Sequence, residues 1–223
     1  MQFEGILFDC DGVLVDSEPI TLGALRHMLN ASGWAITAEE CQHIFIGKTV
    51  RSETARIERE TGRPLTDAWM AAFYALRDEG LHARLQAVPG AVAAVQQCHA
   101  LLGGNIAVAS GADKAKVLMQ LDKVGLLPLF DPHIFSGHDL PRTKPFPDVY
   151  LAAAASLRRD PRRFLVIEDA LPGLQAGLAA GATVWGYCPR EGGHTTPEAL
   201  LAAGAQRVLR DMGELPGLLG QTG

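Results

Sequence analysis

The amino-acid sequence has 223 residues, of which 48% are hydrophobic and 20% are charged, and this balance excludes intrinsic disorder for most of its length. Lysine and arginine number 20 against 25 aspartates and glutamates, and neither sign forms a long run, so a nucleic-acid-binding surface is not expected. No stretch approaches the roughly 20 apolar residues of a membrane span, and the first residues lack the pattern of a signal peptide.

The cysteines are widely spaced and form neither a zinc motif nor a redox pair. They are Cys10, Cys41, Cys98 and Cys188. We expect reduced thiols in a cytoplasmic protein, with Cys10 half-buried at the end of a strand and pointing away from its acidic neighbours.

The chain begins with a short β-prone apolar run, Phe3–Phe8, which stops abruptly at Asp9, as a buried parallel strand entering a loop would. A block without strand signals follows. Leucines recur there at helical spacing, Thr37 and Glu40 have the form of a capping box, and further helices are expected over about 50–61 and 66–85.

Beyond residue 85, strands alternate with helices. Buried strands are predicted at Asn105–Ser110, Ile134–Ser136, Phe164–Glu168, Thr183–Tyr187 and Gln206–Leu209. Helices are predicted between them at 91–102, 114–124, 147–157, 171–180 and 197–203. This alternation predicts an α/β fold with a doubly wound, Rossmann-like parallel sheet. Its core would comprise 1–16 and 86–223, with 17–85 inserted as a helical cap, and the Gly-rich tail after Leu215 is expected to fray.

Acidic residues follow two of the predicted strands. Asp9 and Asp11 come after the first, and Glu168 with Asp169 ends the fourth. Because the carboxyl ends of parallel strands share one edge of the sheet, these carboxylates would meet and repel one another. A hard divalent cation such as Mg²⁺ relieves that repulsion. Either pair alone is more typical of turns and helix caps, but both pairs at matched strand ends favour a metal site, so we interpret them as candidate metal ligands.

Two further strand ends carry groups suited to binding an anion. Ser110 and Gly111 follow a buried strand and open toward a helix, and Lys144 lies in the loop beyond the next strand. Carboxylates with a cation, a hydroxyl beside backbone amides and a lysine together predict a pocket for phosphoryl transfer.

Competing motifs fail on their spacing. Gly47-Lys48-Thr49 lacks the glycine of a nucleotide-binding loop, because Gln42 stands in its place. Ser110 lacks the flanking glycines of a hydrolase nucleophile elbow. The histidines show no zinc spacing, and surface or capping roles are expected for His133 and His138.

The string Asp9-Cys10-Asp11-Gly12-Val13-Leu14-Val15-Asp16-Ser17-Glu18 resembles the first motif of the haloacid dehalogenase-like (HAD) hydrolases. Val108–Gly111, Lys144-Pro145 and Ile167–Asp169 with Gly173 resemble the second, third and fourth motifs. The helical insert is similar to the C1-type cap of the branch that holds phosphoglycolate phosphatase, β-phosphoglucomutase and sugar-phosphate phosphatases. The resemblance therefore implies a HAD core with an inserted helical cap.

The resemblance also implies a role for each residue. Asp9 would be the nucleophile, and Asp11 would protonate the leaving oxygen and then activate water. Mg²⁺ would be held by Asp9, the backbone carbonyl of Asp11 and Asp169, with Glu168 nearby or ligating directly. Ser110, Gly111 and Lys144 would hold the transferred phosphate. The metal-free dehalogenases of the superfamily lack the second aspartate, so Asp11 favours phosphate chemistry.

The expected activity is Mg²⁺-dependent hydrolysis of a small, sugar-type phosphate monoester through an aspartyl-phosphate. Gly47, Lys48 and Thr49 resemble a substrate-specificity loop of the cap, and a solvated lysine is an equally good interpretation. Two alternatives stay open: a phosphosugar mutase like β-phosphoglucomutase, and a non-catalytic phosphate-binding regulatory module. The expected partner is a small phosphorylated metabolite, with no nucleic acid and no membrane.

Overall fold

The computed structural model describes residues 3–45, 48–191, 193 and 195–221. It divides into two compact units: the α/β unit, Met1–Asp16 with Gln86–Gly223, and the helical unit, Ser17–Leu85. Among the described residues, no helix is both long and apolar enough to cross a membrane.

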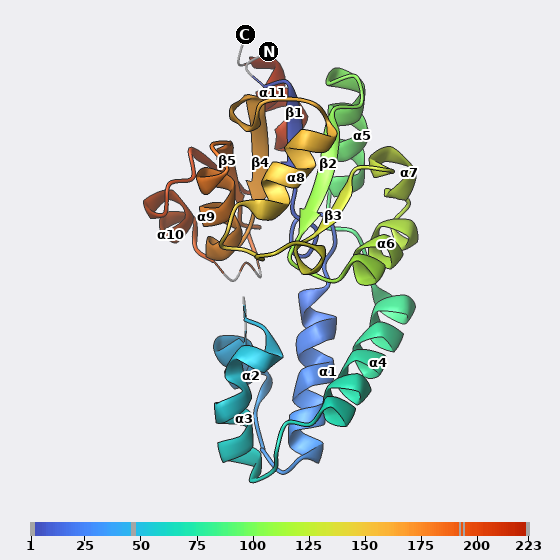
Figure 1. The fold of residues 1–223 in the computed structure, drawn as a ribbon, viewed down its shortest axis with the longest axis vertical. Coiled ribbons are helices and arrows are strands. Elements are labelled where there is room, and N and C mark those ends of the chain that lie inside the picture. The colour runs from blue at the N-terminus through green and yellow to red at the C-terminus, as the bar shows by residue number, and fades with distance from the viewer. Residues whose placement is uncertain (1–2, 46–47, 192, 194, 222–223) are drawn as a thin grey trace. The chain divides into compact units, whose positions relative to one another are not determined.

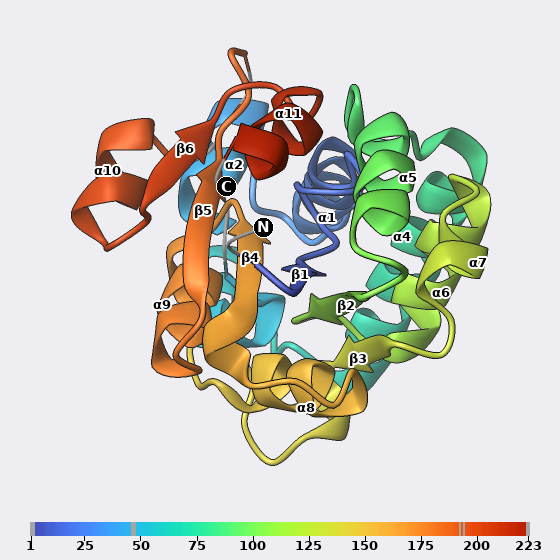
Figure 2. The ribbon, with the colours of Figure 1, turned by 90° about the horizontal axis from the view of Figure 1, so that it is seen from above.

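The α/β unit is built on a six-stranded sheet in the order β3-β2-β1-β4-β5-β6, and every neighbouring pair is parallel (Figure 1 and Figure 2). The strands are β1 (Gly5–Phe8), β2 (Ile106–Ser110), β3 (Ile134–Ser136), β4 (Phe164–Glu168), β5 (Thr183–Tyr187) and β6 (Arg207–Leu209). The apolar runs of β1, β2 and β4 are buried throughout, as central strands covered on both faces require.

Helices cover both faces of this sheet (Figure 2). One face carries α8 (Asp148–Ser156), α9 (Leu171–Ala179) and α10 (Pro197–Ala202), and the other carries α5 (Ala91–Leu101), α6 (Lys114–Lys123), α7 (Leu127–Phe130) and α11 (Glu214–Gln221). The first face packs small side chains of α8 and α9 against Leu7, Val166 and Val184. On the other, Phe8 meets Phe130 edge-to-face.

The helical unit holds α1 (Glu18–Ala31), α2 (Ala38–Phe45), a 3₁₀ turn η1 (Val50–Glu53), α3 (Thr54–Thr61) and α4 (Asp67–Arg84). The predicted capping box is confirmed, since Thr37 Oγ1 accepts from the Glu40 amide and Glu40 Oε2 accepts from the Thr37 amide. Apolar residues of α1, α2, α3 and α4 form the core of this unit.

The predicted fold class is confirmed: the protein is α/β, with a six-stranded parallel sheet and a helical insert after β1. Three local differences appear. The short α7 is not expected from the sequence, and two further 3₁₀ turns, η2 (Gly137–Asp139) and η3 (Pro161–Arg163), lie in loops. The expected fraying after Leu215 is wrong: α11 continues to Gln221, because Leu215 and Leu219 are buried on one face of that helix despite its glycines.

Candidate active site

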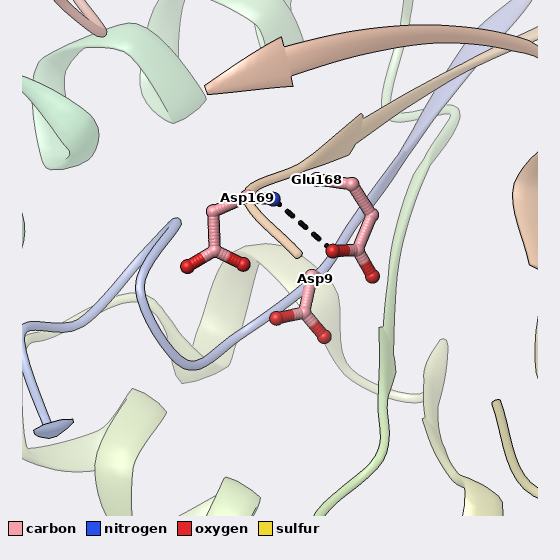
Figure 3. A group of neighbouring side chains, drawn as sticks. All are labelled: Asp9, Glu168 and Asp169. Carbon is pink, nitrogen blue, oxygen red and sulfur yellow. Dashed lines mark hydrogen bonds between the residues drawn. The ribbon is translucent and has the colours of Figure 1, made fainter. Parts of the chain in front are cut away.

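Three carboxylates meet at the carboxyl edge of the sheet (Figure 3). Asp9 directly follows β1, Glu168 is the last residue of the neighbouring β4, and Asp169 comes next. One oxygen from each lies within 4.8 Å of the others, and all three residues are buried. The parallel pairing of β1 with β4 therefore builds an acidic group from residues that are far apart in the sequence.

Lys144 supplies the positive charge that contacts this acidic group. Its Nζ donates to Asp9 Oδ1 at 2.5 Å and to Glu168 Oε1 at 2.6 Å, and it lies 5.0 Å from the centre of the Tyr150 ring. The loop between β3 and α8 brings it there. The lysine thus bridges the two strand ends.

Glu168 is held by donors on both of its oxygens. Besides Lys144, the Tyr150 hydroxyl donates to Oε1 at 2.8 Å, and the amides of Asp169 and Ala170 donate to Oε2 at 3.1 and 3.2 Å. A Cβ at Gly173 would fall 1.6 Å from Oε1, so only glycine leaves room for this carboxylate. The side chain is fixed from several directions.

Asp169 is packed against the turn that follows β1. Gly12 has a φ of +79°, and a Cβ there would lie 1.9 Å from Asp169 Oδ2. Both the backbone conformation and the close approach therefore require glycine at this position.

Burial changes the protonation of these groups. Desolvation raises the pKa of Asp9 to about 7, helped by the charges of Glu168 and Asp11 and opposed by Lys144. Desolvation lowers the pKa of Lys144, but the charges of Asp9 and Glu168 outweigh it and raise this pKa well above its ordinary value. Both shifts favour the protonated forms, a neutral Asp9 and a charged Lys144.

A metal ion fits this donor set. Among the described residues, three buried carboxylates lie together, and the ammonium of Lys144 contacts two of them, Asp9 and Glu168. A hard divalent cation with oxygen ligands would balance the remaining charge. Asp9, Glu168 and Asp169 can each offer one carboxylate oxygen to such an ion.

The Asp11 carboxylate lies outside this group of oxygens and has partners that are not expected from the sequence. Lys116 Nζ donates to both Asp11 oxygens at 2.9 Å, and Gln120 Nε2 donates to Oδ1 at 2.8 Å. The two aspartates of the first motif therefore have different environments. Lys116 and Gln120 lie four residues apart on α6, so they share one face of the helix, but this spacing is also common among surface residues and does not identify them from the sequence.

Cys10 differs from its expected half-buried state. It is fully buried, and its Sγ donates to Gln120 Oε1 at 3.5 Å. Burial raises the pKa of this thiol well above its ordinary value, with the charges of Asp11 and Asp9 adding to the effect. The thiol is therefore neutral and contacts α6 through Gln120.

The predicted phosphate-binding residues end β2 beside Lys144. Ser110 is buried, and its Oγ accepts from the Ala112 amide at 3.0 Å. A Cβ at Gly111 would lie 4.0 Å from Lys144 Cδ, so this turn and the lysine are neighbours. The turn continues through Asp113, which caps the N-terminus of α6.

The remaining candidates have local partners. Lys48 Nζ forms an ion pair with Glu53 at 2.8 Å, and Thr49 Oγ1 caps η1, while Gly47 lies outside the described residues. His138 lies in η2, and His133 Nδ1 is 3.1 Å from Ser156 Oγ.

Comparison with known proteins agrees with this geometry. The sequence model of one protein family, the haloacid dehalogenase-like hydrolases, matches residues 3–181 of this chain. The 6-phosphogluconate phosphatase of Escherichia coli K12 is 29% identical over 188 residues, which cover 84% of this chain and 83% of the relative. Hexitol phosphatase A of the same organism is 33% identical over 189 residues, with 82% of each chain covered. A HAD family hydrolase from Deinococcus radiodurans R1 with bound phosphate and sodium has a TM-score of 0.83 at 31% identity, covering 99% of this chain and 96% of that one. The expected resemblance is confirmed, and the chain belongs to the haloacid dehalogenase-like hydrolases.

Proposed function

We propose that this hydrolase is a Mg²⁺-dependent phosphatase that cleaves a small, sugar-type phosphate monoester through an aspartyl-phosphate on Asp9. The observation that carries the proposal is the buried group of Asp9, Glu168 and Asp169, bridged by Lys144 at the carboxyl edge of the sheet. The names of the relatives, 6-phosphogluconate phosphatase and hexitol phosphatase A, support the substrate class.

In this proposal, an Asp9 carboxylate oxygen attacks phosphorus while the bond to the leaving oxygen breaks. Asp11 gives its proton to that oxygen, later takes a proton from the water that attacks the phosphorus, and Asp9 is released with inorganic phosphate. Lys144, Ser110 and Gly111 hold the phosphoryl oxygens.

Mg²⁺ would be held by Asp9, Asp169 and the backbone carbonyl of Asp11, with Glu168 anchoring Lys144 beside it. When bound, the ion supplies charge neutralisation, which a carboxylate needs before it can approach a dianionic phosphate.

We further propose that 1–16 and 86–223 form the catalytic core and that 17–85 acts as the cap. In the cap, Gly47, Lys48 and Thr49 would determine the specificity for a small phosphorylated metabolite. The four cysteines are free and buried, which favours work in the reducing cytoplasm.

The test is release of inorganic phosphate from a panel of sugar, sugar-acid and polyol phosphates, with Mg²⁺ and after its removal by a chelator. Asp9→Asn keeps the shape of the side chain and removes the attacking charge, so it should release no phosphate above background. Near wild-type rates in Asp9→Asn, or in the chelated enzyme, would overturn the mechanism.

The same panel separates the proposal from its alternatives. Hydrolysis in ¹⁸O-labelled water should place the label in inorganic phosphate. Accumulation of an isomeric sugar phosphate, stimulated by a sugar bisphosphate and without phosphate release, would establish a mutase instead. Tight phosphate binding without turnover of any ester would establish a binding module.

A further inference from the structure

One face of α6 reaches the loop after β1 through two side chains. Lys116 Nζ lies 2.9 Å from both oxygens of Asp11, and Gln120 Nε2 lies 2.8 Å from Oδ1. The two donors are one helical turn apart, so they approach the same carboxylate from one rigid element. Three nitrogen-to-oxygen contacts on one carboxylate leave it little rotational freedom.

The Gln120 amide is itself oriented. Gln120 is fully buried, and its Oε1 accepts from the Cys10 thiol at 3.5 Å. With the oxygen directed to Cys10, the amide nitrogen is left to donate to Asp11. A reversed amide would set its oxygen against a carboxylate, which is repulsive.

These contacts differ from those of a surface ion pair. The Lys116 side chain is 9% exposed and the Asp11 side chain 26%, so both groups have lost much of their hydration. Burying such a pair seldom adds to stability compared with apolar side chains of similar size. A role in positioning Asp11 explains why the chain keeps a lysine and a glutamine at these places.

We propose that Lys116 and Gln120 are positioning residues for Asp11, holding its carboxylate apart from the Asp9, Glu168 and Asp169 group so that it serves proton transfer. The inference rests on the proposed function. The acidic oxygens that gather within 4.8 Å include none from Asp11, and the donors of α6 hold its carboxylate elsewhere. In this way α6 gives the two aspartates of one motif separate tasks.

Removing the ammonium should impair only the part of catalysis that depends on Asp11. Lys116→Met keeps the length of the side chain and loses its charge. An alkyl phosphate needs its leaving oxygen protonated, whereas p-nitrophenyl phosphate has a good leaving group and needs little help. We expect kcat/KM to fall about 10- to 100-fold for the best alkyl phosphate of the panel, and several-fold less for p-nitrophenyl phosphate.

Three further variants make the test specific. Lys116→Arg should recover much of the alkyl rate, because it restores a cation with donors. In an Asp11→Asn background, Lys116→Met should not change the ratio of alkyl to aryl rates any further. Lys114→Met, on the exposed side of the same helix, should behave as wild type.

If Lys116→Met proves unstable in a thermal melt, Gln120→Met is measured in its place and should show the same preference for losing the alkyl rate. Equal losses on both esters would overturn the positioning role, and an undiminished effect in the Asp11→Asn background would assign Lys116 to the substrate instead. Wild-type enzyme that releases phosphate from neither ester would overturn the proposed function, which is a different result from either of these.

Discussion

Two sets of ion pairs, one from each unit of the molecule, lie in very different surroundings. In the α/β unit, Lys144 is 10% exposed and its partners Asp9 and Glu168 are 9% and 1% exposed. In the helical unit, Arg51 and Asp67 form a pair of similar length with 55% and 93% of their side chains exposed. The first set is enclosed by protein, and the second is surrounded by solvent.

The comparison concerns how much an exposed and a buried ion pair contribute to the free energy of unfolding. An exposed pair contributes little, because water and salt screen both charges. A buried pair carries a desolvation cost that its own attraction repays only in part. In the proposed function, the groups at the carboxyl edge of the sheet act on a substrate, and the following predictions measure how the buried and exposed pairs differ.

The largest effect is expected for Lys144→Met. This change leaves Asp9 and Glu168 facing each other in a buried place, so the free energy of unfolding should fall by about 3–5 kcal/mol. Phosphatase activity should fall at least about 100-fold, since the charge on the transferred group loses a partner. Urea unfolding and phosphate release check both expectations, and a loss below 1 kcal/mol would contradict the comparison.

We expect a large effect of pH on the stability of the metal-free protein, because of Asp9. The fold raises the pKa of this residue from its ordinary value of 3.8 to about 7. Because the fold prefers the protonated form, this residue stabilises it at low pH, and that contribution is lost as the pH rises toward and through about 7. The metal-free protein should therefore melt at a lower temperature at pH 8 than at pH 5.

The Asp9→Asn variant provides the control for this experiment. It should flatten the pH dependence over that range, and Mg²⁺ should raise the melting temperature of the wild type more at pH 8 than at pH 5. Should Asp9→Asn retain the full slope, the titrating group must be sought elsewhere.

A moderate effect is expected for Tyr150→Phe. The Tyr150 hydroxyl donates to Glu168 at 2.8 Å, and burial together with the charge of Glu168 raises its pKa well above the ordinary value, so it remains a donor. Losing a buried hydrogen bond to a charged group should cost about 1.5–3 kcal/mol in urea unfolding. Tyr74→Phe, at a partly exposed position of α4, is the matched control and should change little.

The smallest effect is expected for Arg51→Met. Its partner Asp67 is almost fully exposed, so the free energy of unfolding should change by less than about 1 kcal/mol. Asp67→Asn should give an equally small change by the same measurement. A loss above 2 kcal/mol for either variant would remove the contrast between this exposed pair and the buried contacts of Lys144.

The sequence predicted the strands well because their apolar runs are short, β-prone and bounded by polar turns. The limits of β3, β4 and β5 agree with those expected from Ile134, Phe164 and Thr183 onward. It failed at α11, where the glycines suggested a loose tail. Burial of Leu215 and Leu219 outweighs the weak helix propensity of Gly217 and Gly220.

The residues of the candidate site were predicted from their positions at strand ends. The residues that donate hydrogen bonds to their side chains from the helices were not predicted. The positions of Asp9 and Glu168 follow from the parallel topology, because it aligns the ends of β1 and β4. Lys116, Gln120 and Tyr150 lie on helices, where a polar residue in a partly apolar sequence looks like any surface position. Only tertiary packing turns their side chains toward the carboxylates.

The central position of β1 in the sheet also determines when the acidic group can form during synthesis of the chain. Ile6 pairs with Ile106 on one side and with Leu165 on the other, so the strand that is translated first has both its neighbours in later parts of the chain. The acidic group cannot assemble until β4 has been made, because Glu168 and Asp169 are absent before then. A growing chain on the ribosome therefore carries Asp9 without its acidic neighbours, and the raised pKa of Asp9 can arise only after β4 has been made and has paired with β1.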